Sequence, residues 1–97
     1  MNLLTTNATG NITGVWLPFR GVFPNTRAHL VILGDHGGAS YSLYWRPAGI
    51  TDGTKMLLAK YIDVSTEVMQ SIDVSDGEVQ IVIAGGSGVN AMPKLVF

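Results

Sequence analysis

The sequence predicts an all-β fold, either a small antiparallel β-sandwich or a barrel of about seven to eight short strands. The first observation is that apolar segments rich in β-branched residues recur at roughly even spacing along the chain. The second is that clusters of glycine, aspartate and proline, which are typical turn residues, separate these segments. The third is that no long window keeps the hydrophobic period of a helix.

The N-terminal residues are mostly polar and differ in composition from the rest of the chain. We divide the sequence into an N-terminal arm or edge segment, residues 1–11, and a single β-domain, residues 12–97. A terminal segment of this kind is ordered only when something holds it. Its apolar side chains include Leu3 and Leu4, which are candidates for contact with a partner.

The β-domain begins with an extended segment, residues 12–19. Because Pro18 cannot donate a backbone hydrogen bond to a sheet, this strand should lie at a sheet edge or end there. A turn is expected at residues 21–25, where Pro24 fixes φ and Asn25 suits a turn position.

The middle of the chain predicts a β-hairpin. Its first arm, Ala28–Leu33, is an apolar run rich in β-branched residues, and its second arm, Ser40–Arg46, alternates between two faces. The connection, residues 34–38, reads Gly-Asp-His-Gly-Gly, and glycine supplies the positive φ values that tight turns need. Pro47 then ends the second arm.

The C-terminal half predicts four more strands, at residues 56–64, 67–74, 79–84 and 91–97. Residues 56–60 favour a helix by propensity and residues 61–64 favour a strand. We predict a strand over 56–64 because no strong helix start precedes it. A short helical turn near residues 65–67 is the alternative at the start of the next strand, 67–74. The turns between these strands are expected at residues 51–54, 75–78 and 85–88.

The apolar positions of these strands form the predicted core. Its members are Val15, Leu17, Leu30, Ile32, Leu43, Trp45, Leu58, Ile62, Ile72, Val79, Ile81, Ile83, Leu95 and Phe97.

The composition limits the classes of function. The chain has 97 residues, which suit one domain, and 13% of them are charged, about half the usual share. Such a domain either hides part of its surface against another chain or is a tightly packed monomer, and both readings stay open. The net charge is −1 and the basic residues are scattered, so we expect no nucleic-acid partner.

The sequence also argues against a membrane protein and a disulfide-bonded one. It contains no cysteine and no apolar run near the ~20 residues that a spanning helix needs. The N-terminus lacks the features of a signal peptide. We therefore expect no membrane partner. If the protein reaches the outside of a cell, it travels by another route, such as assembly into a particle.

No motif for catalysis, metal binding or cofactor binding stands out. Asp35 and His36 are too few for a metal site, and we expect His36 to lie in a solvated turn. Ser87 lies in a glycine turn and outside any nucleophile motif, and no lysine and helix start follow it as a phosphate loop requires. We predict no catalytic residues, no metal and no cofactor, and hence a protein that is not an enzyme.

Aromatic side chains offer a different kind of site. Trp16, Tyr41, Tyr44, Trp45 and Tyr61 could stack against sugars on one β-face, or Tyr41 and Trp45 could belong to the core with Tyr44 half exposed. The candidate interaction surface is Leu3, Leu4, Trp16, Phe19, Tyr44 and Tyr61.

Two stretches resemble a known class of proteins. The run Arg27–Trp45 combines an apolar strand, Gly-Asp-His-Gly-Gly and a strand ending in Tyr-Trp, and Glu78–Phe97 adds Val-Gln-Ile-Val-Ile-Ala-Gly-Gly-Ser-Gly before a final apolar strand. Together they resemble the small β-sandwich virion proteins of tailed bacteriophages, which include capsid decoration (cement) proteins and some tail components. No catalytic residues come with this resemblance.

The resemblance implies a structural protein, made in the host cytoplasm, that stabilises a phage head by binding across coat subunits on the capsid surface. Its partner would be the major capsid protein or another virion protein, and it would act as a homo-oligomer, with a trimer favoured. Residues 1–11 would order on docking by strand addition. Deleting them should then weaken attachment and leave the fold intact.

The alternative is a carbohydrate- or receptor-binding β-module of a phage tail or a cell surface. It would use the exposed tyrosines and Trp16. The sequence leaves the choice between a head and a tail location open.

Overall fold

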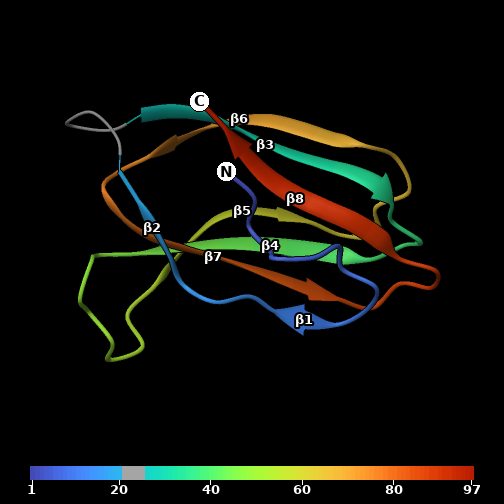
Figure 1. Ribbon diagram of the computed structural model, residues 1–97, viewed down its shortest axis with the longest axis horizontal. Helices are drawn as coiled ribbons and strands as arrows, with labels where there is room; N and C mark the ends of the chain where they lie inside the picture. Colours follow the sequence, from blue (N-terminus) through green and yellow to red (C-terminus); the bar gives the residue numbers. More distant parts are fainter. Residues whose placement is uncertain (21–25) are drawn as a thin grey trace.

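A computed structural model describes residues 1–20 and 26–97, and these form two antiparallel β-sheets that pack face to face (Figure 1). The described residues contain no helix, so the predicted all-β fold is confirmed. The turn expected at residues 21–25 lies outside the described residues.

The strands of the smaller sheet, sheet A, are β6 (Val68–Val74), β3 (Thr26–Asp35) and β8 (Asn90–Val96), and β3 lies between the other two. The strands of sheet B are β1 (Ile12–Thr13), β2 (Leu17–Phe19), β7 (Gly77–Ala84), β4 (Ser40–Arg46) and β5 (Met56–Tyr61). In sheet B, β1 and β2 both pair with one edge of β7, whose other edge pairs with β4, and β5 follows β4.

Most predicted strands are present close to their expected bounds. The ambiguous segment 56–64 is a strand as far as Tyr61, and no helical turn forms at residues 65–67. Pro18 lies in β2, which pairs only with β7, so its expected place at a sheet edge is confirmed. The segment 12–19 contains two short strands where we predicted a single one.

The predicted hairpin is wrong, because β3 and β4 belong to different sheets. The connection between β3 and β4 bonds to two other connections of the chain. The Gly38 N–H donates to the Val64 carbonyl at 3.0 Å, and the Ser87 N–H donates to the Gly37 carbonyl at 2.9 Å. The inner faces of β3 and β4 therefore oppose each other across the core. Two alternating strands joined by a glycine turn look alike in sequence whether they pair side by side or cross between sheets.

His36 lies in this connection between the two sheets and is buried, so the prediction of a solvated turn is also wrong. Only 3% of the residue is exposed, and its Nδ1 lies 2.8 Å from the buried hydroxyl of Tyr41. The two rings meet edge to face at 5.6 Å. His36 is buried at the end of the sandwich, and Tyr41 of the next strand supplies its hydroxyl partner. The spacing of residues in the sequence reveals neither feature.

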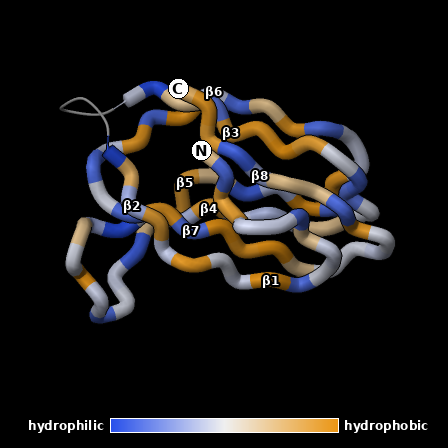
Figure 2. The backbone as a smooth tube through the Cα atoms, viewed as in Figure 1, coloured by the Kyte–Doolittle hydropathy of each residue, from blue (hydrophilic) through white to orange (hydrophobic). Residues whose placement is uncertain are grey.

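The core lies between the sheets, and hydrophobic positions alternate with hydrophilic ones along the strands (Figure 2). Three predicted members are exposed: Val15, Ile62 and Phe97. Each lies just outside a strand, where the two-residue alternation no longer sets the side-chain direction. Leu17, Trp45 and Leu58 are only partly buried and pack against the core, and the remaining predicted members are buried.

The N-terminal segment runs along the outer edge of β8. The Leu3 N–H donates to the Pro93 carbonyl at 3.0 Å, and Ala8 and Ala91 exchange backbone hydrogen bonds of 2.7 and 3.1 Å. Leu3, Leu4 and Ala8 are buried in the core. An arm that orders on docking would first have to leave this edge, and deletion of residues 1–11 would open the core. We therefore no longer expect such a truncation to leave the fold intact.

Candidate interaction surfaces

The six residues of the predicted interaction surface do not form a single surface. Leu3, Leu4 and Phe19 are buried. Tyr61 is half-buried, and its hydroxyl bonds to the side chain of Gln70, which links β5 to β6. Trp16 and Tyr44 contact cations of the same hollow region on the outer side of sheet B.

A β-bulge presents Trp16 to this outer side. Thr13 pairs with Val82, but Leu17 pairs with Val79, so one extra residue is accommodated between them. The Gly14 N–H donates to the Ile81 carbonyl at 2.8 Å, and the buried side chain of Gln80 donates to the Gly14 carbonyl at 2.9 Å. The bulge that divides the segment 12–19 into β1 and β2 therefore also sets the position of Trp16.

Arg46 lies over the ring of Trp16. Its guanidinium carbon is 4.3 Å from the ring centre, and its Nε donates to Glu78 Oε1 at 2.9 Å. Arg46 and Glu78 are direct cross-strand partners on β4 and β7, with side chains 16% and 22% exposed. The ion pair and the ring contact together hold the guanidinium in one orientation.

The connection between β4 and β5, which extends from the end of sheet B in Figure 1, provides the other side of the hollow. Its Lys55 ammonium lies 4.3 Å from the ring centre of Tyr44. Asp52 Oδ1 accepts a hydrogen bond from the Thr54 N–H at 2.9 Å, as expected for a turn at residues 51–54. The hydrogen bonds from Thr54 lower the pKa of the exposed Asp52 carboxyl.

We call the resulting depression the Trp16 hollow. Its volume is about 280 Å³, and its lining combines an aromatic ring, two cations, an amide and three hydroxyl groups. The lining residues are Thr13, Trp16, Arg46, Thr51, Gly53, Thr54, Lys55 and Gln80.

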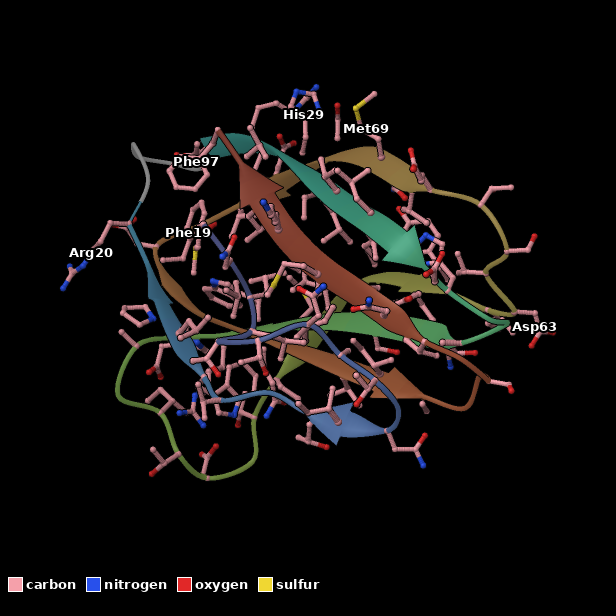
Figure 3. All side chains as sticks on the ribbon, turned by 45° about the vertical axis from the view of Figure 1, so that its right-hand side comes forward. Phe19, Arg20, His29, Asp63, Met69 and Phe97 are labelled. Carbon is pink, nitrogen blue, oxygen red and sulfur yellow. The ribbon has the colours of Figure 1, made fainter. Side chains whose placement is uncertain are left out.

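The outer side of sheet A has the opposite character. Cross-strand pairing places Val31 opposite Met69 and Leu33 opposite Met92, so apolar side chains of all three strands are neighbours. Met69 is 76% exposed and points away from the sandwich (Figure 3). We call this surface the apolar face, and its members are Val31, Leu33, Met69, Met92 and Val96.

Polar groups lie within and beside the apolar face, and Lys94 stands opposite Val31, between Met92 and Val96 on β8. Arg27 Nε donates to Asp73 Oδ1 at 2.7 Å, and the Ser71 hydroxyl lies 3.1 Å from His29 Nδ1. Both groups of the Arg27–Asp73 pair are more than half exposed, so this ion pair contributes little to stability. Beyond the end of β8, the exposed ring of Phe97 lies against the buried Phe19, with ring centres 5.1 Å apart (Figure 3).

Two tyrosine hydroxyls also have shifted pKa values. Burial raises the pKa of the Tyr41 and Tyr61 hydroxyls, which makes them weaker acids. Among residues 1–20 and 26–97, no three histidine, aspartate or glutamate side chains are grouped so that they could hold a metal ion. The absence of an enzymatic activity and of a cofactor stays a prediction.

Comparisons with models of protein families, with curated proteins and with solved structures found no match to the chain. No helix in the described part of the chain is long and apolar enough to cross a membrane. The resemblance to virion proteins therefore stays a prediction, and the two surfaces have to be interpreted from their own chemistry.

Proposed function

We propose that this protein is a structural component of a tailed-phage particle, a capsid decoration protein that attaches through its apolar face. The observation that carries the proposal is the group of apolar side chains on the outer side of sheet A, where Leu33, Met69 and Val96 are exposed. Lys94, opposite Val31, interrupts this group on β8. Sheet B packs on the other side of sheet A. Exposed apolar side chains gathered on one side of a sheet mark a site of protein contact.

The apolar face suits attachment without chemistry. Burying apolar surface contributes roughly 25 cal/mol per Å², and a face with few charges loses little hydration energy when a partner covers it. Only 13% of the residues in the chain are charged, which agrees with this design. A coat protein that presents a matching apolar patch is the partner that these features favour.

Several copies of the protein bound to one another would attach more strongly than a single copy. A homo-oligomer, with a trimer as the favoured form, would engage several coat subunits at once. Linked contacts of this kind raise the overall affinity by orders of magnitude without any new interaction. The oligomer would lie across the seams between coat subunits on the capsid surface of the virion.

The direct test is the composition of particles purified from the source. Mass spectrometry would quantify this chain against the major coat protein. A copy number comparable to that of the coat protein supports a decoration protein. A few copies per particle would move the protein to a vertex or tail and overturn the capsid-wide role, and complete absence would overturn the virion assignment.

The alternative function, a carbohydrate- or receptor-binding module, has one specific observation in its favour. The Trp16 hollow offers an aromatic ring, one face of which Arg46 covers, together with hydrogen-bonding side chains, and this combination is typical of small-molecule sites. This hollow and the apolar face lie on opposite sheets, so the two functions do not compete for the same surface.

A further inference from the structure

We infer that the Trp16 hollow binds an acidic saccharide, a sugar ring that carries a carboxylate. The inference rests on the alternative function above, because it names the ligand class of a sugar site. It does not depend on attachment through the apolar face.

Charge is the first argument. The Arg46 charge is balanced by Glu78 at 2.9 Å, whereas Lys55 has no ion-pair partner among the described residues, and its ammonium lies over the Tyr44 ring. Asp52 in the same turn is also charged, but it does not line the hollow, whereas Arg46 and Lys55 do. The lining of the hollow therefore carries an excess of positive charge, which favours an anionic group on the ligand.

Hydrogen bonding is the second argument. The hydroxyls of Thr13, Thr51 and Thr54 can each donate and accept, which matches the hydroxyl groups of a sugar. The amide of Gln80, which also lines the hollow, donates to the Gly14 carbonyl through its nitrogen. A small inorganic anion would use the ammonium of Lys55 but would leave most of these groups without a ligand contact.

Preorganisation is the third argument. The bulge at Gly14 sets the position of Trp16, and Arg46 is held on that ring by Glu78. Little side-chain freedom is lost when a ligand enters such a site, which favours binding. A volume of about 280 Å³ lies at the low end for ligand sites, so the hollow suits one sugar ring and not a long oligosaccharide.

The test is an NMR titration of the ¹⁵N-labelled full chain with sodium glucuronate, with glucose and sodium phosphate as comparison ligands. We expect saturable shifts for glucuronate, with a dissociation constant of about 1–10 mM, as befits a shallow site with one ionic contact. The shifted signals should be the Trp16 indole N–H and the backbone amides of Thr13, residues 51–55 and Gln80. Glucose and phosphate, which each match only part of the site, should both bind about tenfold more weakly than glucuronate.

Two lysines of sheet B supply the matched variants. Lys55→Gln removes the unpaired charge and should weaken glucuronate binding about five- to tenfold. Lys60 is exposed on the outer side of β5, opposite Ser42, and does not line the hollow, so Lys60→Gln should leave binding unchanged. Both residues are exposed, and unchanged spectra away from the hollow would verify that the variants fold.

Several results would overturn the inference: no saturable shift with glucuronate, equal affinity for glucose, an equal response to phosphate, or equal losses in the two lysine variants. None of these results bears on the particle composition, so failure of this inference and failure of the capsid proposal are distinguishable.

Discussion

The outer sides of the two sheets differ in almost every respect that matters for binding. Sheet A presents apolar side chains from β3, β6 and β8, with Lys94 among them and an exposed ion pair beside them. Sheet B presents a tryptophan, two cations and several hydroxyl groups, and its ion pair is mostly buried. One core supports both surfaces, so a small sandwich can attach to a partner on one side and leave the other side open for a second ligand.

We expect the largest loss of stability from a substitution in the connection between β3 and β4, through which the chain passes from sheet A to sheet B. In Gly37→Ala, the new Cβ would lie 1.9 Å from the Ser87 carbonyl oxygen, at a φ of +56° that alanine disfavours. We expect a loss of about 3 kcal/mol or more in the free energy of unfolding, measured by urea denaturation.

Gly38→Ala is the matched control for this substitution. Its φ of +82° is also positive, but no atom lies within 4 Å of the added Cβ, so only the backbone strain of about 1 kcal/mol should appear. Equal losses in the two variants would contradict the role of the close contact between residues 37 and 87.

The next effect should separate the two surfaces. Leu33→Lys places a charge on the apolar face, and burying it unpaired under a partner should weaken particle binding about 30-fold or more, measured by co-sedimentation with shells that lack the protein. Leu57→Lys is the matched control, because Leu57 faces Tyr44 on sheet B and is 47% exposed, against 46% for Leu33. If both variants bind shells equally well, the apolar face is not the site of attachment.

A smaller effect concerns the core between the surfaces. Tyr41→Phe removes the hydroxyl that lies 2.8 Å from His36 Nδ1 and should cost about 1–3 kcal/mol at neutral pH. Because burial raises the pKa of Tyr41, the unfolded chain loses the tyrosine proton at lower pH than the folded chain does. The stability of the natural protein should therefore fall as the pH rises above about 10.

Urea denaturation at pH 7 and at about pH 11 measures both parts of this prediction. Phenylalanine does not titrate, so the difference between the variant and the natural protein should narrow at the higher pH. A difference that stays constant with pH would show that the Tyr41 proton makes no contribution.

The smallest effect should have opposite signs for stability and for binding. Glu78→Gln removes the partner of Arg46 and should cost about 1 kcal/mol of stability, since the pair is mostly buried. It also leaves the Arg46 charge unbalanced, so affinity for glucuronate should rise about two- to threefold. Asp73→Asn on sheet A is the control: its ion pair is exposed, and neither quantity should change measurably.

Local pattern in the sequence was sufficient for the strands and for much of the core. The alternation of Val79, Ile81 and Ile83 places all three side chains inside, because residues two apart in a strand share a face. Pro18 marks an edge strand, because it lacks the hydrogen-bond donor that a central position needs. The same reasoning failed at Val15, Ile62 and Phe97, which lie outside the strands where alternation applies.

Only the tertiary structure decided which strands pair, what surrounds His36 and how the Trp16 hollow is assembled. A glycine connection is compatible with both a hairpin and a passage between sheets, and in this structure Gly37 and Gly38 bond to Ser87 and Val64 of other connections. Trp16, Arg46, Lys55 and Gln80 come from four separate parts of the chain. The sequence by itself determined the strands and their apolar sides, which depend on near neighbours, whereas pairing and the site depend on contacts between residues far apart in the chain.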